Sequence, residues 1–172
     1  MAQFHPDAQF HQRDQSRLVT VELDGATIAR HDEALERERK VAMFDLVEES
    51  VFRPVRSDER GTAGPYRLNL SVSEGRLALR IADAQDAELE TVILGLSSFK
   101  RPVRDYFAIC QSYFSTLAGG GAAQIETVDM ARRRLHDEGA SLLKERLAGK
   151  IDLDFATARR LFTLICVLHI RA

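Results

Sequence analysis

The chain contains no tryptophan and only two cysteines among its 172 residues. Cys110 and Cys166 both fall within apolar helical patterns, where a cysteine behaves as a small buried hydrophobe. The sequence has no Cys-x-x-Cys pair, so neither a disulfide framework nor a cysteine-based metal site is expected. The two thiols are therefore predicted to be free and buried.

Neither sign of charge is in large excess, because 24 basic and 26 acidic residues leave a formal net charge of -2. Such a chain has no overall field that would attract it to nucleic acid or to an acidic membrane surface. It also has no apolar run long enough to span a bilayer, and residues 1–15 lack the apolar core of a signal peptide. We expect a cytoplasmic protein that does not bind membranes, and we rank nucleic-acid binding, which would have to be local, behind the other functions.

The common catalytic signatures are missing as well. The loop 60–65 contains glycine but lacks the Gly-Lys-Ser/Thr ending of a phosphate-binding loop, and there is no Gly-x-Ser-x-Gly motif. His136 does not begin a zinc motif, because a helical zinc site places its second ligand four residues later, at Ala140. No metal and no cofactor are expected from these patterns.

The spacing of apolar residues predicts an α+β fold. Residues 1–16 carry little apolar periodicity and are predicted to form a disordered tail, followed by a single domain over residues 17–172. Alternation predicts strands, and spacings of three and four predict helices. The predicted strands are Leu18–Leu23, Tyr66–Val72, Leu77–Ile81 and Val92–Leu96, and the predicted helices are Leu35–Val47, Phe99–Leu117, Ala122–Ala148 and Asp154–Arg171.

This order of elements predicts an antiparallel sheet, made of a meander and the N-terminal strand, with about four helices on one face. Residues 51–65 hold two prolines and two glycines and are predicted to form a short extended piece and an exposed loop. Gly139 is expected to be a point at which the third helix kinks.

The last predicted helix is the most informative segment, because residues 161–168 are apolar on every side. Such a helix has to be enclosed by protein, either by this fold or by a second copy. The helix and the apolar stripe from Val103 to Leu117 together exceed what one sheet face is expected to cover. We therefore predict a homodimer that forms through helical surface.

Two groups of basic residues are candidates for binding an anion. Lys100, Arg101 and Arg104 lie in the first turns of a predicted helix, where the helix dipole disfavours cations and favours anions. A bound phosphate or carboxylate would explain their position. The simpler alternative is that they are exposed and pair with acidic neighbours such as Asp105.

The second group lies along one face of the third predicted helix. The spacing of Asp129, Arg132, Arg133 and His136 aligns a guanidinium with an imidazole, which could bind an anion and transfer a proton. The structural alternative is that Asp129 pairs with Arg133 and that His136 borders a helix seam. His169 ends the last helix and is a further candidate if it meets His136 in space.

Several phrases of the sequence resemble a bacterial family of uncharacterised proteins, family 0262. They are Gly64-Pro65-Tyr66-Arg67-Leu68, Asp105-Tyr106-Phe107 with Ile109-Cys110, Gln124-Ile125-Glu126 through Asp129-Met130, and the run from Gly149 to Arg171. The resemblance covers about residues 18–171. It supplies no activity, substrate or catalytic residue to transfer.

These patterns lead to two functional hypotheses. The first is a small binding protein that self-associates and recognises a protein partner or an anionic small molecule. The alternative is an enzyme acting on a phosphorylated or carboxylated metabolite, with His136 as acid or base and Arg132 or Arg133 as the anion clamp. Convergence of His136, His169 and the arginine groups in one cleft would favour the enzyme.

Overall fold

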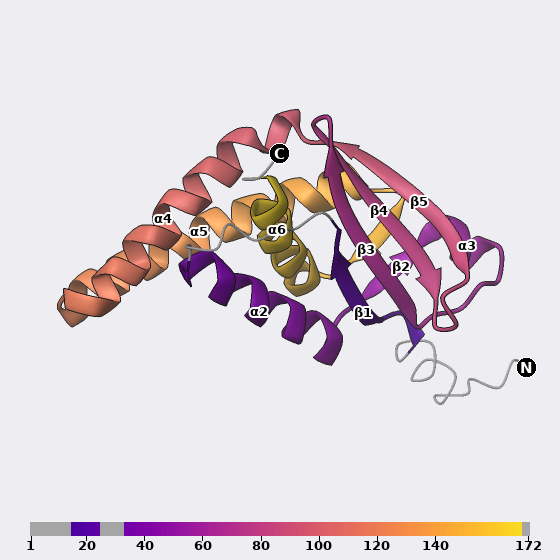
Figure 1. The fold of residues 1–172 in the computed structure, drawn as a ribbon, viewed down its shortest axis with the longest axis horizontal. Coiled ribbons are helices and arrows are strands. Elements are labelled where there is room, and N and C mark those ends of the chain that lie inside the picture. Colours follow the sequence, from indigo (N-terminus) through magenta and orange to yellow (C-terminus); the bar gives the residue numbers. More distant parts are fainter. Residues whose placement is uncertain (1–14, 25–32, 170–172) are drawn as a thin grey trace, which may run out of the picture.

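The main sheet consists of four strands, β1 (Leu18–Leu23), β3 (Tyr66–Ser73), β4 (Arg76–Asp83) and β5 (Glu88–Gly95), in this spatial order (Figure 1). The computed structural model describes residues 15–24 and 33–169 of the chain. Apolar side chains alternate along β3, β4 and β5 and are buried on one face of the sheet. The α+β class and the predicted meander are confirmed.

The N-terminal strand departs from the predicted antiparallel arrangement. β1 pairs parallel to β3, with Leu18 opposite Tyr66 and Leu23 opposite Leu70, whereas the other pairs are antiparallel. Parallel neighbours need a long connection between them, and the chain between β1 and β3 contains a complete helix. That crossover allows the parallel pairing.

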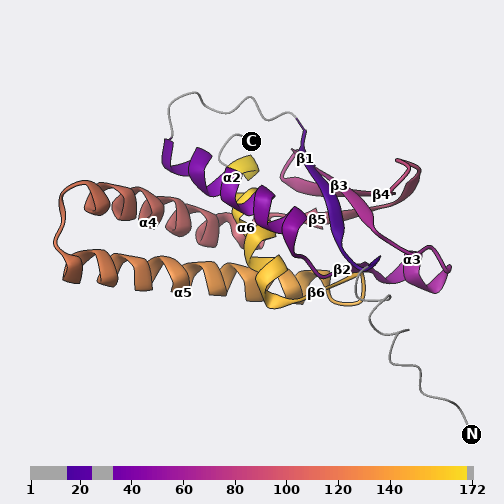
Figure 2. The ribbon, with the colours of Figure 1, turned by 90° about the horizontal axis from the view of Figure 1, so that it is seen from below.

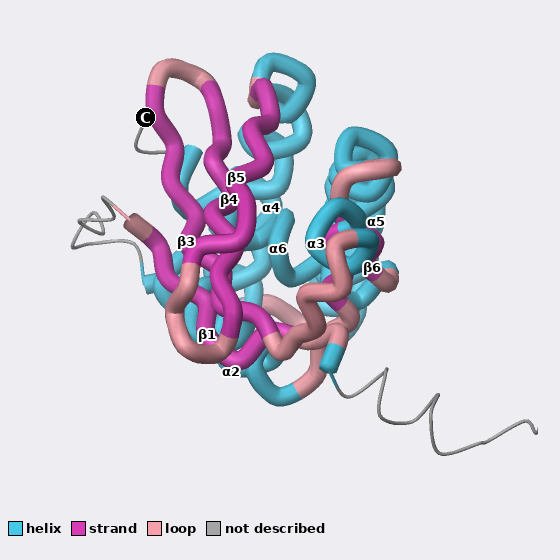
Figure 3. Tube along the Cα trace, turned by 90° about the vertical axis from the view of Figure 1, so that its right-hand side faces the viewer, coloured by secondary structure: helices cyan, strands magenta, loops and turns pink. Residues whose placement is uncertain are grey.

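Four long helices cover one side of the sheet: α2 (Glu33–Glu48), α4 (Lys100–Gly119), α5 (Ala122–Leu147) and α6 (Phe155–His169). Figure 3 shows the main sheet on one side of the molecule and these helices on the other. A short 3-10 turn, η1 (Ser97–Phe99), leads into α4. In Figure 2, α4 and α5 run side by side, and α6 crosses them and packs against α2.

The helix α6 lies at the centre of the core, as the sequence predicts. Each of the residues 161–168 is buried, and α6 contacts α5, α2, α4 and β3. Its N-terminus is capped by Asp154, whose Oδ1 accepts a hydrogen bond from Thr157 N at 2.9 Å. One chain therefore encloses its own most apolar helix, and a second copy is not needed to bury it.

The hairpin of α4 and α5 extends beyond the core (Figure 1). The buried residues of α4 are Val103, Tyr106 and Cys110, and those of α5 begin at Gly139. The far half of the predicted stripe, which ends at the exposed Leu117, is therefore not part of the core. Both cysteines are free and buried.

Residues 51–65 contain more structure than the predicted extended piece and loop. The strand β2 (Phe52–Pro54) pairs antiparallel with β6 (Ile151–Leu153), and a short helix α3 (Val55–Glu59) follows β2. This second sheet joins segments that lie far apart in the sequence. Strands of three residues are too short to give a readable alternation.

The predicted kink at Gly139 is absent, because α5 is one continuous helix over Ala122–Leu147. A Cβ atom at position 139 would lie 2.3 Å from Cε1 of Phe162 on α6. The glycine therefore allows close contact between the two helices.

The predicted N-terminal tail is described only in part, because residues 1–14 lie outside the described residues. Within the described part, Ser16 O accepts a hydrogen bond from Phe52 N at 2.9 Å. Within the described residues, every helix is too short or too polar to cross a membrane.

Candidate functional site

A cleft with a volume of about 470 Å³ lies between α2, α5 and α6. α2 and α6 each contribute residues spaced at three, four and seven along one face, and α5 contributes two adjacent pairs one turn apart. The volume falls within the range of small-molecule pockets, which is roughly 300–1,000 Å³. The lining residues are Glu38, Val41, Ala42 and Asp45 of α2, Arg132, Arg133, His136 and Asp137 of α5, and Ala156, Arg159, Arg160 and Thr163 of α6.

Three ion pairs around the cleft each join a different pair of helices. Arg132 Nη1 of α5 lies 3.2 Å from Glu38 Oε1 of α2. Arg160 Nε of α6 lies 3.8 Å from Asp45 Oδ2 of α2. Arg159 Nε of α6 lies 3.3 Å from Asp137 Oδ1 of α5. The charged residues of the cleft thus also hold its three helices together.

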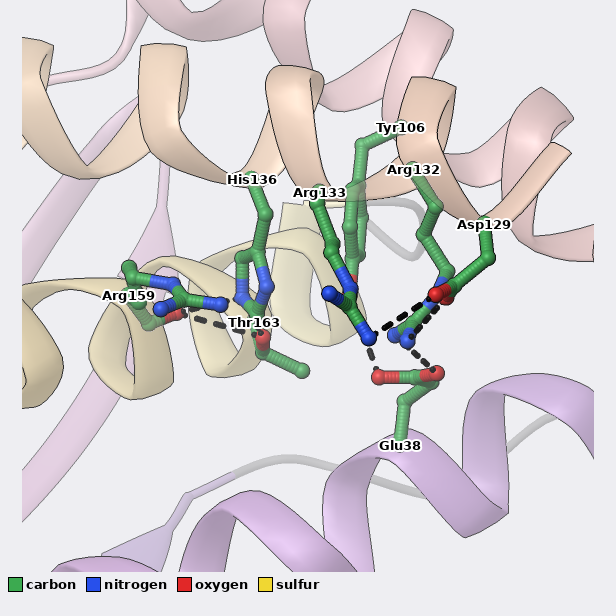
Figure 4. A network of polar contacts seen from close by, with 8 residues as sticks. All are labelled: Glu38, Tyr106, Asp129, Arg132, Arg133, His136, Arg159 and Thr163. Atoms are coloured by element: carbon green, nitrogen blue, oxygen red, sulfur yellow. Dashed lines mark hydrogen bonds and ion pairs between the residues drawn. The ribbon is translucent and has the colours of Figure 1, made fainter. Parts of the chain in front are cut away.

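Arg132 is the most constrained of the arginines (Figure 4). Besides Glu38, its guanidinium bonds Asp129 Oδ1 at 3.0 Å and lies 4.7 Å from the centre of the Tyr113 ring. Burial by itself lowers the pKa of Arg132, but the hydrogen bond to Asp129 and the charge of Glu38 raise it above its usual value. Arg132 is a fixed cation, and each of its three guanidinium nitrogens already has a carboxylate partner.

Glu38 is held from two sides. Its Oε2 accepts a hydrogen bond from the hydroxyl of Tyr106 at 3.1 Å, and its Oε1 accepts one from Arg132. Burial, followed by the charges of Cys110 and Glu38, raises the pKa of Tyr106 far above its usual value. The Tyr106 phenol therefore remains a neutral donor, and it fixes the carboxylate that orients Arg132.

His136 lies at the floor of the cleft against α6 (Figure 4). Its Nε2 is 2.8 Å from the backbone oxygen of Arg159 and 2.7 Å from Thr163 Oγ1. A carbonyl oxygen can only accept, so Nε2 carries the hydrogen and donates it, which leaves Nδ1 as the acceptor of a neutral ring. Burial is the main reason that the pKa of His136 falls to about 4. The ring is therefore uncharged at neutral pH.

Two arginines keep donors that other groups could use. Arg159 Nε is the one buried side-chain nitrogen or oxygen within residues 15–24 and 33–169 that has no hydrogen-bond partner, because its contact with Asp137 lacks hydrogen-bond geometry. Arg133 has a side chain that is 67% exposed and pairs with Asp129 at 3.0 Å. The cleft is lined by four guanidinium groups and three carboxylates, which leaves one positive charge in excess. The carboxylate of Asp129, which pairs with Arg132 and Arg133, balances this charge.

The structure separates the sequence-derived candidates into two groups. Arg132, Arg133 and His136 meet in the cleft, whereas His169 lies near Lys100 at the start of α4. Burial, with a further contribution from the charge of Lys100, lowers the pKa of His169.

Arg101 and Arg104 are exposed, and each has its Nε near Asp105, at 3.5 and 3.6 Å. This is the simpler of the two arrangements considered for them. The convergence of all the basic groups in one place, which would have favoured an enzyme, does not occur.

The model of the Uncharacterised protein family (UPF0262) matches residues 15–171. The chain belongs to this family. A UPF0262 protein from Novosphingobium aromaticivorans is 58% identical over 159 residues, which cover 90% of this chain and 97% of the relative. Relatives from Erythrobacter litoralis and Rhodospirillum rubrum are 55% and 50% identical, over 91% and 92% of this chain and 98% and 96% of theirs. No solved structure gives a significant match.

Sequence reasoning identified one wall of the cleft in this UPF0262 protein and missed the other two. Glu38 belongs to a charge run that reads as a solvated helix face, and Arg159 and Arg160 flank an apolar segment. The available signal is the spacing of Ala156, Arg159, Arg160 and Thr163, which places four mainly polar residues on one face of an otherwise apolar helix. Among the described residues, no three His, Cys, Asp or Glu side chains form a group that could hold a metal ion.

Proposed function

We propose that this protein binds a small molecule carrying a phosphate or carboxylate group in the cleft between α2, α5 and α6. The observation that carries the proposal is Arg159 Nε, a buried atom that makes no hydrogen bond within the described residues, although it lies 3.3 Å from Asp137 Oδ1. A buried N–H that makes no hydrogen bond costs free energy, and an anionic oxygen that accepted a hydrogen bond from Arg159 Nε would remove this cost. Arg133 lines the same cleft and has the freedom to turn toward such a ligand.

The geometry supports binding more than the alternative of proton-transfer catalysis. A histidine with a pKa of about 4 is a weak base at neutral pH and carries almost no proton to donate. Its Nε2–H is already engaged by the Arg159 carbonyl, and Arg132 is engaged by Glu38 and Asp129. In this proposal, neutral His136 shapes the floor of the cleft and leaves the charge recognition to the arginines.

The proposal is tested by thermal unfolding in inorganic phosphate against chloride at equal ionic strength. A ligand present at a hundred times its dissociation constant stabilises the native state by about 2.7 kcal/mol, which corresponds to roughly 5–10 °C in Tm for a chain of this size. We expect the phosphate-specific increase in Tm to be lost in Arg159→Gln. The matched control is Arg101→Gln, an exposed arginine on α4 whose ion pair lies outside the cleft.

Each outcome distinguishes between sites. Loss of the phosphate effect in Arg101→Gln, with retention in Arg159→Gln, would place the anion at the group of Lys100, Arg101 and Arg104 instead. An equal effect in both variants would be a general salt effect on the whole surface. Absence of a phosphate-specific effect in the unmodified protein, repeated with a panel of small carboxylates, would refute the proposal and leave the three ion pairs as links between helices.

Self-association remains a prediction, but its basis changes. α6 is enclosed within its own chain and offers little surface to a second copy. α2, in contrast, carries some of the most exposed large apolar side chains among the described residues.

A further inference from the structure

Three apolar side chains form a row on the outer face of α2. Val41, Phe44 and Val47 have exposed fractions of 59%, 66% and 39%. Their spacing of three residues places them on one face of the helix, opposite Ala42 and Leu46, which are buried in the core. α2 is therefore apolar on two faces, and the described residues cover only one of them. We name Val41, Phe44 and Val47 the α2 row.

The charges beside the α2 row differ between its two ends. Lys40 precedes the row and is largely exposed, and Glu48 follows it and is also exposed. Lys40 lies 3.9 Å from Glu36, at the limit of an ion pair, so a second carboxylate could approach it. The row thus has a positive end and a negative end, four residues on either side of Phe44.

We propose that the α2 row is the contact surface between two copies of this chain, with the two α2 helices packed antiparallel about a two-fold axis at Phe44. In this arrangement Phe44 meets Phe44 of the second copy, and Val41 meets Val47. Lys40 of each copy then lies beside Glu48 of the other, which forms two equivalent ion pairs. A parallel arrangement would oppose Lys40 to Lys40 and Glu48 to Glu48, so the charge pattern selects the antiparallel one.

Analytical ultracentrifugation of the full chain over the micromolar range tests this surface. We expect a concentration-dependent species of twice the 19.3 kDa mass of one chain. Phe44→Glu should shift the equilibrium to the monomer, because it places two like charges at the two-fold axis. The control is Met130→Glu, which introduces the same charge at a similarly exposed apolar residue of α5. A circular dichroism spectrum of each variant verifies that it is folded.

Charge exchange tests the antiparallel orientation. Lys40→Glu and Glu48→Lys should each weaken the dimer severalfold, and the double variant should recover most of the loss because the pairs are restored with reversed sign. A monomer at every concentration would overturn the proposal, as would a dimer that Phe44→Glu leaves unchanged. A dimer whose double charge variant shows no recovery would overturn the antiparallel arrangement. Val41 of the α2 row also lines the cleft, but the substituted residues Lys40, Phe44 and Glu48 do not, so these variants leave the lining of the anion site unchanged.

Discussion

Gly139 of α5 lies directly against the ring of Phe162 of α6. A Cβ atom at position 139 would approach Cε1 of Phe162 to 2.3 Å and Cζ to 2.4 Å. The Phe162 ring is completely buried and packs against Tyr106 and Phe99, with centroid distances of 5.6 and 6.5 Å. Because the ring is held on all these sides, the glycine sets how closely α5 can approach α6. That approach also brings His136 to the Arg159 carbonyl.

Gly139→Ala is therefore expected to destabilise the protein. Alanine favours a helix over glycine by about 1 kcal/mol, but overpacking a core costs typically about 1–3 kcal/mol. The net loss should lower Tm by a few degrees, measured by thermal unfolding. The matched control is Gly119→Ala in the last turn of α4, where a Cβ atom would meet no atom within 4 Å. If Gly139→Ala were as stable as this control, the contact with Phe162 would have to be looser than described.

The long elements of the fold were predictable because each carries a repeated local pattern. Alternation over eight residues marks β3, and a run of apolar residues between Asp154 and His169 marks α6 as buried. Gly139 was misread as a kink, since a sequence does not state which side chain faces a glycine. The pairing of β2 with β6 could not be predicted, because each strand has only three residues and the two strands lie about a hundred positions apart in the sequence.

The boundary of the predicted N-terminal tail can be tested by deletion. Ser16 belongs to the predicted tail, yet its carbonyl accepts a hydrogen bond from Phe52 N, and Phe52 is completely buried. Removing residues 1–16 should therefore destabilise the protein by about 1 kcal/mol more than removing residues 1–14, because a buried N–H loses its acceptor. Urea unfolding of the two truncated chains measures this difference. Equal free energies of unfolding would show that water or another group replaces Ser16.

The candidate site was only partly predictable for a similar reason. The spacing of Arg132 and His136 places them on one face of α5, and this much follows from the sequence alone. The partners that decide their chemistry are Glu38, Arg159 and Thr163, which come from other helices. The pKa of His136 depends on its burial, and burial depends on how closely α5 packs on α6. Local spacing cannot supply this information.

His136 also predicts how stability depends on pH. Its pKa is about 4 in the folded protein and about 6.5 in the unfolded chain, so between these values the unfolded state binds a proton that the folded state does not. Stability contributed by neutral His136 is thus complete above about pH 6.5 and decreases as the pH falls toward 4. Between about pH 7 and pH 5 the expected loss is on the order of 2 kcal/mol in the free energy of unfolding. Urea unfolding at both pH values should show this loss in the unmodified protein and a much smaller loss in His136→Gln. The control, His169→Gln, should retain most of the dependence, since His169 is only half-buried. If His136→Gln kept the full pH dependence of the free energy of unfolding, that dependence would come from other titratable groups. The His136 ring would then have to be in contact with solvent.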